Sequence, residues 1–321
     1  MNIWESTRIA LNSLGGNKMR AGLTMLGIII GVAAVIALVS IGQGAQAAVT
    51  SQISSIGTNL LFIRPGSSQQ GGVRGAQGSA GTLTLQDAQA LGGISGIQGI
   101  APEVDSFGQV VYQGANMNAR VLGVTPDYAN VTSSQPSSGD FIQQTDVAAS
   151  TSVVDIGSGV AQTLFGDQDP IGKMIRINNV PFRVVGVMQS KGGTGFLSVD
   201  NQVFVPLTTA QTRLARGGQF RGSTNIDVVN VQITDQSVSQ SVTDQISQTL
   251  RDRHHITAQD DFTVQSQQDV LSAATAVTNT LTLFLGGVAA IALLVGGIGI
   301  MNIMLVSVTE RTREIGIRKA V

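Results

Sequence analysis

The stretch Leu281–Val308 reads LTLFLGGVAAIALLVGGIGIMNIMLVSV and contains no acidic or basic residue. A second uncharged run, Leu23–Ile41, reads LTMLGIIIGVAAVIALVSI. The hydrocarbon core of a bilayer is about 30 Å thick and needs about 20 helical residues to cross it. We therefore predict transmembrane helices at residues 23–41 and 281–308. The alternative for each is an apolar helix buried in a protein core.

The first run could also belong to a cleaved signal peptide, because Ala45-Gln46-Ala47 resembles a cleavage site. Signal peptides have an apolar core of about 7–15 residues behind a short basic segment. The run at residues 23–41 is longer than that core, and 22 residues precede it. A membrane anchor is the better interpretation.

Basic residues flank both runs on their outer sides. Residues 1–22 contain three Lys and Arg, and residues 309–321 contain four, whereas residues 42–280 have twelve against seventeen Asp and Glu. Short loops rich in Lys and Arg stay in the cytoplasm. We predict a cytoplasmic amphipathic segment at 1–22, an extracytoplasmic domain at 42–280 and the start of a cytoplasmic loop at 309–321. Both ends of the sequence are therefore expected to be cytoplasmic, on the inner side of a cell membrane.

The overall composition excludes several classes of protein. Only 12% of residues are charged, and 19 Lys and Arg stand against 20 Asp and Glu. Soluble proteins carry roughly 25% charged residues, and nucleic-acid-binding domains concentrate basic ones. The absence of cysteine excludes disulfides, Cys-ligated metals and a cysteine nucleophile. The composition therefore favours a membrane protein that does not bind nucleic acid.

The segment between the two runs alternates strand and helix patterns, which predicts an α+β domain. The predicted strands are 59–63, 120–124, 152–156, 173–177, 182–187, 227–233 and 261–264. Asn178-Asn179 predicts a hairpin turn, and the last two strands with a helix at 237–251 predict a β-α-β unit. We predict that a β-rich module at about 131–222 is inserted into the rest of the domain.

Local patterns also predict a loop and two helix starts. Residues 64–81 (RPGSSQQGGVRGAQGSAG) are rich in glycine and predict a flexible loop. Thr84 with Asp87, and Ser266 with Asp269, fit capping boxes. No proline follows Ser266, so a helix from Gln267 to Val308 would extend about 60 Å and project from the membrane as a stalk.

Sequence patterns for catalysis, cofactor binding or metal binding are absent. Residues 166–174 (GDQDPIGKM) resemble a phosphate-binding loop, but Met174 replaces the required Ser or Thr. His254 and His255 are adjacent and are expected to be surface residues that point apart. Asp167, Asp169, Asp260 and Asp261 lack calcium-loop spacing and are expected to be solvated turn carboxylates. We predict no catalytic, cofactor or metal site in this chain.

Gly27 and Gly31 form a G-x-x-x-G pattern in the first apolar run. Small residues at this spacing let membrane helices approach closely, although glycine is common in such helices. We predict a helix-packing contact at this pair, with ordinary membrane-helix composition as the alternative.

Four stretches resemble the MacB-type permeases of ATP-binding cassette systems, which belong with the FtsX and lipoprotein-releasing permeases. They are Asn17–Arg20 with Leu23–Val32, Leu164–Asp167 with Asp169–Lys173, Gln202–Leu207, and Thr280–Ala320. The last stretch is the most specific. The resemblance covers nearly the whole chain and is weakest in the glycine-rich and Gln/Ser-rich regions.

This resemblance implies two transmembrane helices with long stalks that flank a porter-like module with an inserted β-rich module. It implies an ABC-type export permease that relays the motion of a cytosolic ATPase to its outer domain, with ATP and Mg bound by that ATPase. The other implied partners are a second copy of the chain, a membrane-fusion adaptor and the bilayer. Family members have four membrane helices, so the sequence resembles a permease truncated after the second.

The resemblance also suggests that residues 310–319 (ERTREIGIRK) form the ATPase contact. The coupling residues would be Arg313, Glu314, Ile315, Gly316, Ile317, Arg318 and Lys319. A helix here is expected to present a small apolar knob flanked by charges. The alternative is a basic anchor for anionic headgroups.

Two other functions fit the same topology. An FtsX-like regulator would control a cell-wall hydrolase without moving a substrate. A two-span receptor would sense a ligand with its extracytoplasmic domain. A reading frame for an ATPase next to this one would favour the permease.

Overall fold

The computed structural model describes residues 18–55, 59–70, 73–77, 81–192, 198–214, 225–257 and 259–320. The chain divides into two compact units, one of Met1–Ala47 with Ala273–Val321 and one of Ala48–Ser272. Most of the amphipathic segment predicted at 1–22 lies outside the described residues.

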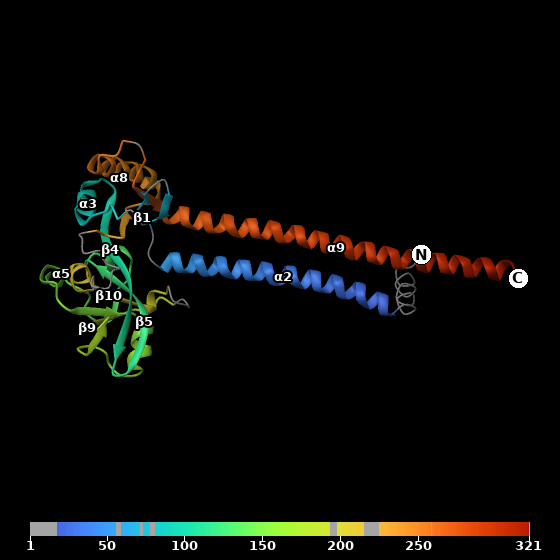
Figure 1. The fold of residues 1–321 in the computed structure, drawn as a ribbon, viewed down its shortest axis with the longest axis horizontal. Coiled ribbons are helices and arrows are strands. Elements are labelled where there is room, and N and C mark those ends of the chain that lie inside the picture. Colours follow the sequence, from blue (N-terminus) through green and yellow to red (C-terminus); the bar gives the residue numbers. More distant parts are fainter. Residues whose placement is uncertain are drawn as a thin grey trace. The chain divides into compact units, whose positions relative to one another are not determined.

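Two long helices contain the apolar runs. Helix α2 spans Lys18–Ser55 and helix α9 spans Gln267–Ala320 (Figure 1). In α2, the stretch Ile29–Ala47 is apolar enough and long enough to cross a membrane. In α9, the stretch Gln267–Val288 meets the same criteria, and a shorter apolar stretch follows at Leu294–Val306. These stretches overlap the predicted spans 23–41 and 281–308 only in part, so the exact membrane boundaries stay a prediction.

The start of α9 follows the predicted capping box. The Ser266 backbone N–H donates to Asp269 Oδ2 at 2.9 Å, and the Asp269 N–H donates to Ser266 Oγ at 3.0 Å. These bonds satisfy two backbone donors that a helix start otherwise leaves unpaired. The predicted helix from Gln267 is confirmed, and it continues without a break beyond Val308.

The unit Ala48–Ser272 is built on one ten-stranded sheet. Its strands run in the order β12-β1-β11-β4-β5-β10-β7-β9-β6, and β8 pairs with β4 and β9. Their bounds are β1 Leu60–Pro65, β4 Ile97–Tyr112, β5 Ala115–Val124, β6 Pro136–Gly139, β7 Val153–Ile156, β8 Met174–Ile177, β9 Val180–Met188, β10 Gln202–Pro206, β11 Val228–Ile233 and β12 Phe262–Ser266.

Several predicted features of this unit are present. Strands β8 and β9 form the hairpin predicted at Asn178-Asn179, where both residues have the positive φ that such a turn requires (48° and 70°). The β-α-β unit appears as β11, helix α8 (Ser239–His254) and β12. Strands β11 and β12 both pair antiparallel with β1, one on each side.

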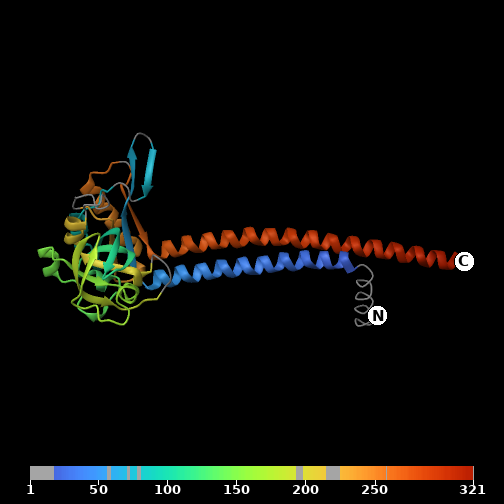
Figure 2. The same cartoon turned by 60° about the horizontal axis from the view of Figure 1, so that its bottom comes forward.

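The predicted loop at 64–81 is partly wrong. Strand β1 continues to Pro65, and β2 (Ser67–Gln70) pairs antiparallel with β3 (Val73–Gln77) (Figure 2). A glycine-rich composition predicts flexibility, but the described residues of this segment form a strand pair.

Buried side chains cover both faces of the sheet. Successive residues of a strand point to opposite sides, so neighbouring residues of one strand belong to different clusters. Val121 belongs to one buried cluster, with Leu61 and Phe182, and Leu122 belongs to another, with Leu60 and Phe204. Buried residues of α3, α6 and α8 join the first cluster, and those of α4 and α5 join the second. The helices are α3 Leu85–Ala90, α4 Tyr128–Val131, α5 Gln144–Ala149, α6 Ser158–Phe165 and α7 Leu207–Thr209, with short turns at Leu91–Gly93, Val199–Asn201, Ala210–Leu214 and Gln236–Val238.

The strands of the predicted insertion extend the same sheet. Strand β10 pairs in parallel with β5, from Gln202 opposite Arg120 to Pro206 opposite Val124. Strands β7, β9 and β6 follow on that side. Strands β6 to β10 therefore share a continuous hydrogen-bonded sheet with the rest of the unit, and the boundary of the module predicted at 131–222 stays a prediction.

Candidate functional site

The predicted coupling residues Arg313–Lys319 form the end of α9. Arg318 Nη2 lies 2.6 Å from Glu314 Oε1, an exposed pair one helical turn apart. Ile315 and Ile317 are 60% and 57% exposed. The segment thus combines exposed apolar and charged side chains on a regular helix.

The apolar knob expected there is wrong in one respect. Residues two apart on an α-helix are separated by about 200°, since 3.6 residues complete a turn. Ile315 and Ile317 therefore lie on nearly opposite sides of α9, with Gly316 between them. A partner that contacts one side of this helix would use one isoleucine and not both. The coupling role itself stays a prediction.

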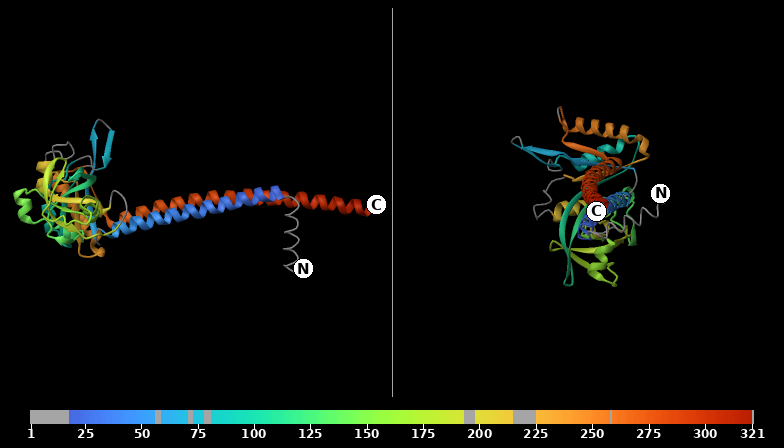
Figure 3. Two further views of the ribbon diagram at one scale, coloured as in Figure 1. Left: turned by 90° about the horizontal axis from the view of Figure 1, so that it is seen from below. Right: turned by 90° about the vertical axis from the view of Figure 1, so that its right-hand side faces the viewer.

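Gly27 and Gly31 lie in α2, but the surroundings of Gly27 fall outside what the structure describes, so their packing stays a prediction. A contact between α2 and α9 is seen further along both helices. Gln46 Nε2 donates to Thr275 Oγ1 at 3.3 Å, and a Cβ on Gly42 would lie 3.8 Å from Thr278 Cγ2. Figure 3 shows the two helices side by side. The sequence predictions do not include this close approach at Gly42.

The phosphate-loop-like residues 166–174 form a turn followed by a strand, as the sequence indicated. Gly166 ends α6 and Met174 begins β8. A phosphate-binding loop instead leads into a helix whose N-terminal N–H groups face the phosphate. Within the described ranges, no group of three or more His, Asp or Glu residues is arranged so that it could hold a metal ion.

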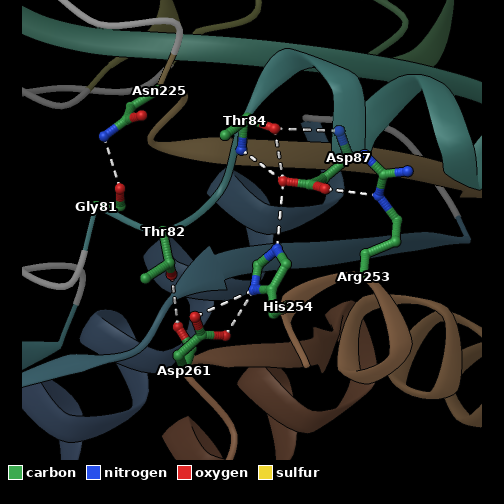
Figure 4. A network of polar contacts seen from close by, with 8 residues as sticks. All are labelled: Gly81, Thr82, Thr84, Asp87, Asn225, Arg253, His254 and Asp261. Atoms are coloured by element: carbon green, nitrogen blue, oxygen red, sulfur yellow. Dashed lines mark hydrogen bonds and ion pairs between the residues drawn. The ribbon is translucent and has the colours of Figure 1, made fainter. Parts of the chain in front are cut away.

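One polar cluster in the unit Ala48–Ser272, called the outer unit below, surrounds His254. Its Nδ1 lies 2.9 and 3.1 Å from the two carboxylate oxygens of Asp261, and its Nε2 lies 3.3 Å from Asp87 Oδ2 (Figure 4). Arg253 Nε donates to Asp87 Oδ1 at 2.7 Å. Asp87 also completes the predicted capping box, because it bonds the backbone and side chain of Thr84. We call Asp87, His254 and Asp261 the histidine clamp.

The histidine clamp corrects two expectations. The side chain of His254 is only 11% exposed, so it is not a surface histidine. Asp261 contacts His254, and Asp260 accepts two hydrogen bonds from Arg251, so neither is simply a solvated turn carboxylate. Asp87 is far from His254 and Asp261 in the sequence, so no local pattern could have predicted that it contacts His254.

The protonation of the clamp follows from these contacts. Burial opposes a charge on His254, but its hydrogen bond with Asp261 and the nearby carboxylate of Asp87 outweigh burial and raise its pKa. Burial likewise opposes ionisation of Asp87, but hydrogen bonds from Thr84 and Arg253 outweigh burial and lower its pKa. The clamp thus favours an imidazolium between carboxylates.

A second polar cluster crosses three strands of the sheet. Arg120 of β5 binds both carboxylate oxygens of Asp105 on β4 and lies 3.7 Å from Glu103. Asn230 of β11 donates to Glu103 Oε2 at 3.0 Å. Burial raises the pKa of Glu103, although Arg120 opposes this effect. The cluster joins β5, β4 and β11, so its evident role is structural.

Comparison with known proteins agrees with this architecture. The family model for the MacB-like periplasmic core domain matches residues 21–249. A macrolide export ATP-binding/permease protein MacB of Bdellovibrio bacteriovorus is 41% identical over 321 residues, covering 99% of this chain and 48% of that protein. The MacB protein of Rhodospirillum rubrum is 42% identical over 319 residues, covering 98% and 47%. The chain therefore spans about half the length of these relatives.

Two solved structures share the fold. The periplasmic region of MacB from Actinobacillus actinomycetemcomitans superposes with a TM-score of 0.55 at 24% identity, covering 69% of this chain and 94% of that one. The extracellular domain of the transporter YknZ from Gram-positive bacteria gives a TM-score of 0.52 at 18% identity, covering 64% and 100%. The family match, the relatives and the shared fold confirm the resemblance seen in the sequence. The chain belongs to the MacB-like periplasmic core domain family, the family of the MacB-type ABC transporter permeases.

Proposed function

We propose that this chain forms the outer domain and two membrane helices of an ABC-type exporter, and that it relays the motion of an ATPase to the outer domain. The observation that carries the proposal is the continuity of α9. One unbroken helix runs from the strand end at Ser266, through the apolar run, to the charged residues near Ala320. A continuous helix is stiff along its axis and can transmit a displacement between its ends.

The lengths of both helices support this arrangement. At 1.5 Å per residue, the 54 residues of α9 extend about 81 Å and the 38 residues of α2 extend about 57 Å. Both exceed a hydrocarbon core of about 30 Å. Each helix can therefore cross a bilayer and continue beyond it as a stalk.

The exposed side chains of α9 support a lipid environment. Leu283 and Phe284 are 80% and 68% exposed. Exposing a large apolar side chain to water costs about 1.5–3 kcal/mol relative to burial, and the run from 281 to 308 offers many such side chains. Although the stretch Gln267–Val288 as a whole is apolar enough to cross a membrane, its first part, residues 267–280 (QQDVLSAATAVTNT), is mostly polar or small and suits water. This change at about residue 281 supports the proposed stalk and span.

Partners follow from the family and from the charge distribution. The basic flanks support cytoplasmic ends and a location in the bacterial inner membrane. Two relatives are named ATP-binding/permease proteins, so the ATPase is either fused elsewhere in the same protein or separate. It would bind ATP and Mg and contact Arg313–Lys319. A second copy of the chain and a membrane-fusion adaptor would complete the exporter.

The relay can be tested by interrupting α9 in the full-length transporter with its ATPase. Seven glycines inserted between Ala276 and Val277 would break the helix, at about 1 kcal/mol per glycine relative to alanine. Seven alanines at the same position are the matched control, because they add about two turns and keep the helix. The readout is the ATP-dependent distance between spin labels at Ser137 in two copies, together with ATPase activity.

We expect ATP hydrolysis in both variants and an ATP-dependent distance change only in the alanine variant. An unchanged response in the glycine variant would refute the relay. Such a response would mean that the motion reaches the outer domain by another route, such as α2.

The ATPase contact is tested with two single variants, Ile315→Asp and Ile317→Asp. Because these residues lie on opposite sides of α9, a one-sided ATPase contact predicts that one variant loses ATPase association and the other keeps most of it. Equal, mild effects of both, with strong effects from neutralising Arg318 and Lys319, would favour the basic anchor.

A further inference from the structure

We propose that the histidine clamp (Asp87, His254 and Asp261) is a pH-sensitive switch that fixes the start of β12 when His254 is protonated and releases it as the pH rises. This inference goes beyond the proposed function and does not rest on it. It concerns three segments of the outer unit: the start of α3, the end of α8 and the residue that precedes β12.

The geometry favours a particular protonation state. Both ring nitrogens of His254 face carboxylates, Nδ1 toward Asp261 and Nε2 toward Asp87. A neutral imidazole has only one N–H, so it can donate to only one of the two. The imidazolium donates from Nδ1 to Asp261 and places its charge 3.3 Å from Asp87, where Nε2 forms an ion pair rather than a hydrogen bond. Loss of one proton therefore turns one of the two contacts into an unfavourable approach of lone pairs to a carboxylate.

The other charged groups around His254 do not replace that proton. Arg253 pairs with Asp87 Oδ1, and Arg251 pairs with Asp260. The ring edge of His254 faces Phe262, with centroids 6.3 Å apart at 89°. After His254 loses its proton, Arg253 would still neutralise Asp87. Among the described residues, no hydrogen bond or ion pair joins Arg251 or Arg253 to Asp261.

Asp261 also carries the backbone contacts that would be released. Its carbonyl oxygen accepts from the Gly66 backbone N–H at 2.6 Å and from Thr82 Oγ1 at 2.9 Å. Asn225 Nδ2 donates to the Gly81 carbonyl beside Thr82 (Figure 4). The Asp261 side chain thus links α8 to the point where the chain after β1, the chain before α3 and the start of β12 meet.

The sign of the pH dependence follows from linkage. The pKa of His254 is raised in the fold, so its stabilisation is complete below the ordinary histidine pKa of about 6.5 and is lost as the pH rises through the raised value. The pKa of Asp87 is lowered, so its contribution is present above about 4 and is lost in stronger acid. The clamp is therefore tightest between about pH 4 and 6.5 and loosens above that range.

The first experiment follows the imidazole nitrogens by NMR in the full chain labelled with ¹⁵N-histidine. The sequence has only two histidines, and His255→Gln assigns the signals. We expect His254 to carry protons on both nitrogens in mild acid and to titrate at a higher pH than in Asp261→Asn. A titration at the same pH in both proteins would overturn the proposal. If Asp261→Asn fails to fold, a neutral His254 in the wild type at pH 5 would overturn it equally.

The second experiment measures the release itself by trypsin cleavage after Arg253, which requires local opening at the end of α8. The ratio of the cleavage rates of His254→Gln and wild type cancels the pH dependence of trypsin. We expect the variant to be cleaved several-fold faster at pH 6 and the ratio to fall toward one by pH 9. A ratio that does not change with pH would show that His254 is only a structural contact and would overturn the switch.

Discussion

Asp155 of β7 gives the clearest test of the physical reasoning, because it is a fully buried carboxyl group with one strong partner. Its Oδ2 accepts from the Ile142 backbone N–H at 3.0 Å, and its Oδ1 has no hydrogen-bond partner among the described residues. Burial raises the pKa of Asp155 to about 8, helped by the negative charges of Asp140 and Asp146. The group is therefore largely protonated in the fold at neutral pH.

The expected magnitude follows from linkage. An aspartic acid in the unfolded chain has a pKa of about 3.9, so the folded state binds one more proton between about pH 4 and 8. Each pH unit in that window then lowers the free energy of unfolding by about 1.4 kcal/mol, or on the order of 5 kcal/mol across it. The sign is opposite to that of a salt-bridged aspartate, since ionisation here opposes folding.

The perturbation is Asp155→Asn, which keeps an acceptor for Ile142 and cannot ionise. We expect the variant to gain stability relative to the wild type as the pH rises from 5 to 8. The assay is urea unfolding of the chain in detergent micelles, followed by circular dichroism at each pH. The matched control is Asp167→Asn, the same chemical change at an exposed carboxylate. Parallel pH profiles for the wild type and Asp155→Asn would refute the reasoning, and an equal effect of the control would show that burial is not its cause.

Two further predictions concern the helices. With single cysteines introduced into this Cys-free chain, Ser137→Cys should react with an impermeant thiol reagent in intact cells and Thr312→Cys should not; the reverse pattern would invert the proposed topology. Replacing Gly27 and Gly31 together by Leu should reduce assembly of the full-length transporter severalfold in cross-linking assays. Gly44→Leu, where a Cβ meets nothing within 4 Å, is the control, and equal effects would make the glycine pattern mere composition.

Much of the fold could be predicted because its signals are local. Uncharged runs without proline predict α2 and α9, and Thr84 with Asp87 predicts a capping box from residues three apart. The Asn178-Asn179 turn is equally local, because both residues tolerate positive φ. Such features depend on neighbours along the chain, so a sequence pattern contains the necessary information.

The histidine clamp could not be predicted, because it depends on long-range packing. Asp87 and His254 come from helices far apart in the sequence, and they meet only because α3 and α8 pack on the same sheet. The error at Ile315 and Ile317 has a different origin. The sequence predicts the helix correctly. The single apolar knob is wrong because residues two apart on a helix point to nearly opposite sides.

Strand β12 is where these separate observations meet. It is an edge strand of the described sheet and has only five residues, paired to β1 from Leu61 opposite Ser266 to Pro65 opposite Phe262. At one end it follows Asp261 of the histidine clamp, and at the other Ser266 caps α9. A displacement of the first turn of α9 would therefore act directly on the hydrogen bonds between β12 and β1. The histidine clamp lies at one end of β12, and the Ser266–Asp269 capping box lies at the other. An edge strand is hydrogen-bonded on one side only, so opening β12 costs less free energy than opening a central strand. The protonation of His254 would set how firmly the end of β12 next to Asp261 is held.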